Sequence, residues 1–177
     1  MGERDMNQFE VDLQHSESQR NKLRDFYSIK AHEGRYIFIN KDKLISKWLQ
    51  DNAVDTIMQI SNRDEVYIEE KIVRWKGKKY EAMTLEVMSC TVPGREKDGW
   101  MKYAKADILA YGFEQEDGSV ELYIMNLFKL KDWFWKNVKN YATTTTEQIN
   151  RTVCKVVPIK DIQENVGFKK FLIPWNK

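Results

Sequence analysis

The sequence predicts a mixed α/β (α+β) domain in which helices flank one central β-sheet. Two patterns predict this class. Apolar and polar residues alternate at residues 66–75 and 80–89, as they do in half-buried strands. Apolar residues recur at helical spacing at residues 41–52 and 127–142, before and after those runs. Strand-like and helix-like segments interleaved in this way are typical of a sheet covered by helices.

The length of the chain favours a single domain. Its 177 residues can bury one hydrophobic core without disulfides or metals. Within this domain, residues 1–177, we expect a helical N-terminal segment at residues 1–30 and a core at residues 34–141. Residues 142–177 are expected to form a basic C-terminal extension of strand and helix, because lysines and arginines outnumber acids there.

The N-terminal half is predicted to contain two helices and the first strands. Asn40 or Asp42 can cap the second helix. The turn-like stretches "SNRDE" and "KGKK" separate three strand-like runs, and we expect those runs to form an antiparallel meander. The elements expected here are a helix at residues 5–27, a strand at 34–40, a helix at 41–52 and strands at 53–61, 66–75 and 80–89.

The C-terminal half is predicted to begin with a loop at residues 91–99. Pro93, Gly94 and Gly99 mark that loop, and "EQEDGS" is typical of a hairpin turn. "TTTT" at residues 143–146 is expected to be a short polar break. The remaining elements expected are a short helix at residues 100–106, strands at 107–113 and 120–126, a helix at 127–142, a strand at 152–158, a helical turn from Pro158 and a final run at 168–175.

Composition excludes several classes of function. No apolar run is long enough to cross a bilayer, so we expect no membrane contact. Two cysteines, Cys90 and Cys154, cannot form a disulfide framework, so we expect a reducing, cytoplasmic location in which both are buried thiols. The sequence has no zinc-type Cys/His spacing, no glycine-rich phosphate loop and no nucleophile elbow. Any catalysis therefore depends on carboxylates, lysine and a bound divalent ion.

Three polar residues interrupt two adjacent strand-like runs. Glu69 and Lys71 are two residues apart and therefore share one face of their strand. If the turn centres between residues 62 and 63, Asp55 lies opposite Glu70 and within about one residue of Glu69. Neighbouring carboxylates require a proton or a cation between them, and such hard oxygen ligands suit Mg²⁺ or Mn²⁺. A nearby lysine can orient or deprotonate a water that attacks a phosphodiester.

An Asp on one strand followed by Glu-x-Lys on the next resembles the PD-(D/E)xK nuclease superfamily. The matching residues are Asp55 and "EEK" at residues 69–71, and the resemblance covers roughly residues 41–135. It implies a restriction-endonuclease-like fold and divalent-metal-dependent hydrolysis of nucleic acid. By this resemblance, Asp55 and Glu69 bind Mg²⁺ (or Mn²⁺) and Lys71 helps to activate water. Glu33 is a candidate for an upstream acid of the site.

The identity of the metal ligands stays open at this stage. Glu86 is expected to be an auxiliary acid, and it or Glu70 can replace Glu69 as the metal ligand. Glu69 and Lys71 also fit an ordinary salt bridge on a solvent-facing strand, and Asp55 also fits a capping residue at the entry to its strand. The metal site and these structural roles are equally consistent with the sequence. They differ in how the three side chains are placed in the folded protein.

Contacts to nucleic acid are expected from basic residues outside this cluster. Lys97, Lys102 and Lys105 lie in and after the loop and are candidates to contact phosphates; a solvated charged loop is the alternative. "WFW" at residues 133–135 fits either core packing or a base-stacking surface, and Trp135 lies away from the apolar stripe of its helix.

The partner expected from these features is nucleic acid, with DNA favoured over RNA. A homodimer is an open alternative. A second hypothesis is a non-catalytic, phage- or defence-related interaction protein on a nuclease-like fold. It would bind a protein or nucleic-acid partner through an aromatic surface. In the enzyme, the carboxyl groups of Asp55 and Glu69 should meet with the Lys71 amine beside them, and in the interaction protein they should point apart or be covered by packing.

Overall fold

Two β-sheets pack around a shared core and confirm the predicted mixed α/β class. The computed structural model describes residues 15, 18, 19, 21–27, 35–38, 44–59, 65–77, 79–146 and 151–174. Within the described residues, no helix is long and apolar enough to span a membrane.

The larger sheet has six strands and is mixed. Its neighbours pair antiparallel except β3 and β6, which run parallel. In spatial order its strands are β1 (Arg35–Phe38), β2 (Thr56–Gln59), β3 (Glu65–Val73), β6 (Ile108–Glu114), β7 (Val120–Asn126) and β10 (Lys169–Ile173).

The smaller sheet has four strands, all antiparallel. A register shift between Glu86 and Met88 bulges β4 against β9. In spatial order the strands are β5 (Lys97–Asp98), β4 (Ala82–Cys90), β9 (Val153–Pro158) and β8 (Ala142–Thr145).

The helices flank the sheets as the apolar spacing predicts. Residues 21–27 are helical, and Asn126 caps α4 by accepting the backbone N–H of Lys129 on its side-chain oxygen. The labelled helices are α2 (Leu44–Asp51), α3 (Trp100–Tyr103), α4 (Leu127–Asn137) and α5 (Ile159–Asn165), with a 3₁₀ turn at Val138–Asn140.

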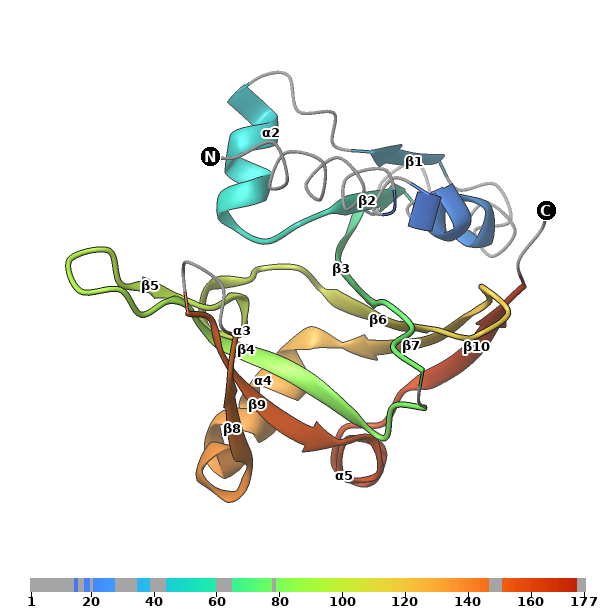
Figure 1. Ribbon diagram of the computed structural model, residues 1–177. Helices are drawn as coiled ribbons and strands as arrows, with labels where there is room; N and C mark the ends of the chain where they lie inside the picture. The colour runs from blue at the N-terminus through green and yellow to red at the C-terminus, as the bar shows by residue number, and fades with distance from the viewer. Residues whose placement is uncertain are drawn as a thin grey trace, which may run out of the picture.

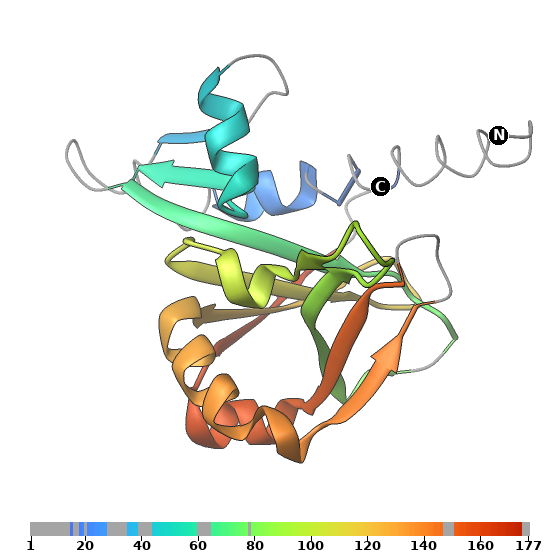
Figure 2. The same ribbon diagram turned by 90° about the vertical axis from the view of Figure 1, so that its left-hand side faces the viewer.

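The six-stranded sheet separates two hydrophobic clusters. Figures 1 and 2 show the helical N-terminal segment on one side of this sheet and α4, α5 and the four-stranded sheet on the other. On one face, Leu23 and Tyr27 of the N-terminal helix pack on Ile68 and Leu122. On the other face, the larger cluster joins β6 and β7 to α4, α5 and the four-stranded sheet. Both faces of β6 are therefore covered, which explains why its sequence is almost continuously apolar.

The expected three-strand meander is wrong at its third strand. β2 and β3 pair antiparallel as predicted, but β4 leaves for the second sheet, and the free edge of β3 pairs with β6 instead. The chain between β3 and β4 does not close a tight turn: the Tyr80 hydroxyl donates to the carbonyl of Arg74 as the strand turns away. Alternation of side chains predicts a strand but not its neighbour in the sheet. The sequence near β3 therefore does not indicate that β6, and not β4, pairs with it.

Two other elements differ from the sequence predictions. The polar stretch at residues 143–146 lies largely in an exposed edge strand, β8, instead of a break, and the loop at residues 91–99 contains the two-residue strand β5. The C-terminal segment supplies β9 to one sheet and β10 to the other. It is thus built into the framework that carries the site.

Candidate functional site

Glu69 and Lys71 share one face of β3, as the alternation of side chains predicts. Their neighbours on that face, Tyr67 and Val73, pack against the larger hydrophobic cluster, whereas Ile68 packs against the other cluster. This face is covered by packing, because Glu69 is only 2% exposed. The interpretation of Glu69 as part of a solvent-facing salt bridge is therefore wrong.

Asp55 lies directly before β2 and is one register position away from the expected place. Thr56 pairs with Ile68, so the pairing continues with Asp55 opposite Glu69 and not opposite Glu70. The backbone N–H of Asp55 donates to the carbonyl of Ile68 at 2.8 Å. The backbone N–H of Glu70 donates to Asp55 Oδ2 at 2.9 Å. Asp55 is thus both a capping residue of the strand pair and a neighbour of Glu69.

The carboxyl of Glu69 lies between a carboxyl and an amine. Lys71 Nζ is 2.5 Å from Glu69 Oε1, and the Asp55 carboxyl lies near enough for its charge to act on Glu69. Burial is the largest cause that raises the pKa of Glu69 to about 8; the charge of Lys71 opposes this shift and the charge of Asp55 adds to it. The structure therefore brings together the three residues that the sequence singled out.

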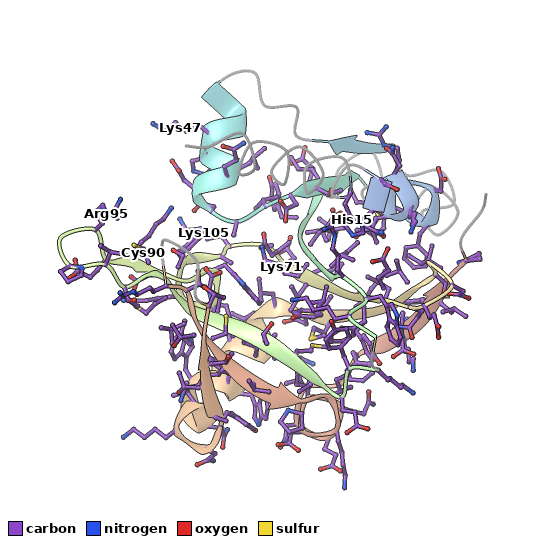
Figure 3. The ribbon with its side chains drawn as sticks, in the orientation of Figure 1. His15, Lys47, Lys71, Cys90, Arg95 and Lys105 are labelled. Atoms are coloured by element: carbon purple, nitrogen blue, oxygen red, sulfur yellow. The ribbon has the colours of Figure 1, made fainter. Side chains whose placement is uncertain are left out.

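Lys71 keeps its positive charge in this cluster. Burial favours a lower pKa, but the charges of Glu69, Asp55 and Glu86 outweigh it and raise the pKa of the amine above its usual value. The Lys71 side chain is 38% exposed, whereas that of Glu69 is 2% exposed. Lys71 is labelled near the middle of the molecule in Figure 3. As an ammonium it can donate hydrogen bonds to a water or to a phosphate oxygen.

Glu86 approaches the cluster from the other sheet. Its carboxylate accepts a long hydrogen bond, 3.4 Å, from the backbone N–H of Trp100 in α3. The Trp100 ring is buried and its centroid lies 5.7 Å from Lys71 Nζ, within the range of a cation–π contact. Glu86 therefore belongs to the electrostatic surroundings of Lys71, and its role as an auxiliary acid stays a prediction.

A glycine allows α3 to approach β4 so closely. The backbone N–H of Gly99 donates to the carbonyl of Val87 at 2.9 Å. A Cβ at Gly99 would meet the carbonyl oxygen of Glu86 and would lie 2.6 Å from its carbonyl carbon. Only glycine fits this contact, which presents Trp100 and Tyr103 to the cluster.

Glu70 lies on the opposite face of β3. Burial raises the pKa of the Tyr27 hydroxyl, and a nearby Glu70 adds to the shift through its charge and a hydrogen bond. Because Tyr27 belongs to the cluster on the far side of the sheet, Glu70 is directed away from Lys71. Glu33 lies outside the described residues.

The donor set fits a hard divalent cation by its chemistry. Asp55 and Glu69 supply carboxylate oxygens from adjacent strands, and three acids surround one ammonium. Among the described residues, no three Asp, Glu, His or Cys side chains form a ready-made metal cage. Mg²⁺ typically needs only one or two carboxylates, with water and substrate phosphate completing its coordination.

The predicted phosphate-contacting lysines do not form one cluster. The Nζ of Lys102 is 2.8 Å from Asp98 Oδ2 in an exposed ion pair, and Lys97 is exposed on β5. Lys105 lines a groove beside α4 that also contains Lys131 and Lys136. Figure 3 shows Lys105 between Lys71 and the loop of Arg95. These contacts stay a prediction.

The three aromatic residues at 133–135 of α4 differ in burial, as their helical spacing indicates. Phe134 is fully buried and Trp133 is partly buried against the core, whereas Trp135 is 40% exposed and lines the groove.

The sequence alone did not indicate that Trp100 and Tyr103 lie beside the carboxylate cluster. Burial and the charges of Glu69 and Glu86 raise the pKa of Tyr103, so this hydroxyl stays protonated beside the cluster.

Comparison with family models, with curated proteins and with solved structures found no match to this chain.

Proposed function

We propose that the protein is a divalent-metal-dependent nuclease that hydrolyses phosphodiester bonds of nucleic acid. The observation that carries this proposal is the meeting of the Asp55 and Glu69 carboxyls with the Lys71 amine 2.5 Å from Glu69. These residues lie on adjacent antiparallel strands, as the resemblance to PD-(D/E)xK nucleases implies.

Each residue has a distinct task in this reaction. Asp55 and Glu69 would hold Mg²⁺ or Mn²⁺, which supplies Lewis acidity toward a phosphate oxygen and a more acidic bound water. Lys71 donates hydrogen bonds that orient the attacking water and offset charge on the phosphate. Trp100, whose backbone N–H donates to Glu86, holds its ring beside the Lys71 amine and limits the positions that the amine can take.

The decisive experiment measures cleavage of labelled single- and double-stranded DNA and RNA with Mg²⁺ or Mn²⁺. Asp55→Asn keeps an oxygen for the Glu70 N–H, and Lys71→Met keeps the side-chain stem beside Trp100, so both variants should fold. We expect each to lose activity by about 100-fold or more, and EDTA to abolish cleavage by the wild type. Lys160→Met, which removes an exposed amine of α5 paired with Glu164, is the control and should stay active.

The burial of Glu69 favours a second candidate, a non-catalytic interaction protein in which the cluster only stabilises the sheets. In that case wild type cuts none of the substrates with either metal. Asp55→Asn and Lys71→Met would then lower the free energy of unfolding without any effect on phosphodiesters. Cleavage by wild type that survives in both variants would contradict the proposed site.

A further inference from the structure

A groove of about 760 Å³ lies beside α4 and is not part of the carboxylate cluster. Its volume is in the usual range for sites that hold small ligands. We call it the α4 groove. The lining residues that matter below are Lys105, Asp107, Phe128, Lys131, Trp135 and Lys136.

Two exposed aromatic side chains lie on the same face of α4. Phe128 is 77% exposed and Trp135 is 40% exposed, although the rest of the helix packs its apolar residues in the core. A separation of seven residues places them about 10 Å apart along the helix axis. The indole N–H of Trp135 donates to the carbonyl of Met101 at 3.3 Å, which fixes the ring at the groove. Large exposed rings of this kind can stack on nucleic-acid bases.

The positive charge of the groove is available to an anion. Lys131 Nζ donates to the carbonyls of Lys102 and Ala104 at 3.0 and 2.7 Å, which leaves its third N–H for a ligand. Lys105 is exposed at the opposite wall.

The two acids of the lining are already engaged. Asp107 Oδ2 accepts the backbone N–H of Tyr67 at 2.9 Å, and Asp132 pairs with Lys136 at 2.7 Å. Lys105, Lys131 and Lys136 outnumber these two acids in the lining, so the groove carries a net charge of +1 and attracts phosphate.

One wall of the groove is shared with the carboxylate cluster. The backbone N–H of Lys105 donates to the carbonyl of Asn52, three residues before Asp55, and that of Asp107 donates to the carbonyl of Tyr67, two residues before Glu69. The segment at residues 100–107 thus presents Trp100 to Lys71 and its later residues to the groove.

We propose that the α4 groove binds an unpaired nucleotide of a single nucleic-acid strand. Its base stacks on Phe128 or Trp135 and its phosphate contacts Lys105 and Lys131. The strand must be unpaired because a base inside a duplex cannot offer its face to a protein ring. This inference rests on the proposed function for its ligand class and adds that the substrate is single-stranded at this point.

The test is a binding titration with the full-length protein in EDTA, followed by fluorescence anisotropy of a labelled oligothymidine strand and of the matching duplex. We expect the single strand to bind at least about tenfold tighter than the duplex. Phe128→Ala should weaken single-strand binding about tenfold, and Phe128→Trp should restore it. Lys105→Gln should weaken binding and reduce its salt dependence.

Two control variants test whether the loss of any exposed apolar side chain or any exposed lysine weakens binding. Leu172→Ala removes an exposed apolar side chain on β10, 66% exposed, and Lys129→Gln removes an exposed lysine of α4 that does not line the groove. Both should bind the strand as wild type does. Equal binding of strand and duplex, no binding of either, or unchanged binding by Phe128→Ala would overturn the inference and leave the groove as a surface for a protein partner.

The outcome is separable from that of the proposed nuclease activity. Single-strand binding that depends on Phe128, in a protein that cleaves nothing, supports the groove and contradicts the nuclease. Cleavage that depends on Asp55, with binding unchanged by Phe128→Ala, supports the nuclease and overturns the groove.

Discussion

Glu69 is a buried carboxyl group that lies near the charge of Asp55 and 2.5 Å from the Lys71 amine. An ionised carboxylate without water is costly, and a single ammonium offsets only part of that cost because Asp55 adds a second negative charge. A neutral Glu69 resolves the conflict by keeping its proton. A divalent cation would resolve it differently, by replacing that proton and attracting both carboxylates.

The raised pKa of Glu69 predicts how stability depends on pH. The unfolded chain releases this proton near pH 4.5 and the folded chain near pH 8. Between these values the folded state binds more protons, so the contribution of Glu69 to stability is greatest below pH 4.5 and is lost as pH rises to about 8. Glu69→Gln cannot titrate. Its free energy of unfolding relative to wild type should therefore rise by about 2–4 kcal/mol from pH 5 to pH 8.5.

Urea unfolding of both proteins across this range, without divalent metal, measures the difference. Lys71 stays charged throughout, so its contribution does not change in this window. A difference between the two proteins that is constant with pH would show that Glu69 is ionised in the folded state at every pH tested.

At the scale of elements, local patterns predicted strands and helices but not all of their partners. The alternation at β3 and β4 and the apolar spacing of α4 follow directly from the sequence. The pairing of β3 with β6 depends on burial from both faces, which one strand alone does not reveal. β8 was missed because a run of threonines has no alternation to detect.

The same distinction applies to the candidate site. Asp55, Glu69 and Lys71 were predictable because one hairpin connects their strands. Trp100 and Tyr103 come from α3, whose position depends on a contact with β4 in the second sheet. No spacing in the sequence encodes that contact. Gly99 is the one feature of the local sequence that relates to the contact between α3 and β4, and a glycine there is equally consistent with an ordinary loop.

The contact of α3 with β4 can be tested at Gly99. In Gly99→Ala the new Cβ would lie 2.6 Å from the Glu86 carbonyl carbon and 2.8 Å from that of Val87, and neither backbone atom can move aside cheaply. We expect a loss of about 3 kcal/mol or more in the free energy of unfolding. If the protein is a nuclease, its activity should fall too, because Trp100 moves away from Lys71.

Glu96→Ala changes an exposed residue of the same loop and is the control; it should alter stability by less than about 0.5 kcal/mol. Denaturation curves for both variants compare the two sites directly. A Gly99→Ala protein as stable as the control would mean that α3 and β4 do not pack this closely.

At the scale of the whole molecule, the two sheets are joined by chain segments that are distant in sequence. β4 leaves the neighbourhood of β3 for the four-stranded sheet, and the C-terminal segment returns with β9 to one sheet and β10 to the other. Val157 of β9 and Ile162 of α5 are fully buried in the larger cluster. The residues of the site, which come from β2, β3 and β4, therefore depend on both sheets being assembled.

A truncated chain that ends at residue 150 tests whether the C-terminal segment is an extension or part of the framework. The truncation removes β9, α5 and β10, which leaves the edges of β4 and β7 unpaired and uncovers Met83 and Leu85. Each lost core contact of this size costs about 2–5 kcal/mol, and the sum exceeds the stability of an ordinary domain.

For the truncated chain we expect no cooperative thermal transition by circular dichroism and no near-ultraviolet signal from packed aromatic residues. Gln163→Ala, which changes an exposed residue of α5 in the whole chain, is the control and should leave the transition in place. A truncated chain that melts cooperatively near the wild-type temperature would show that residues 1–150 fold without the C-terminal segment.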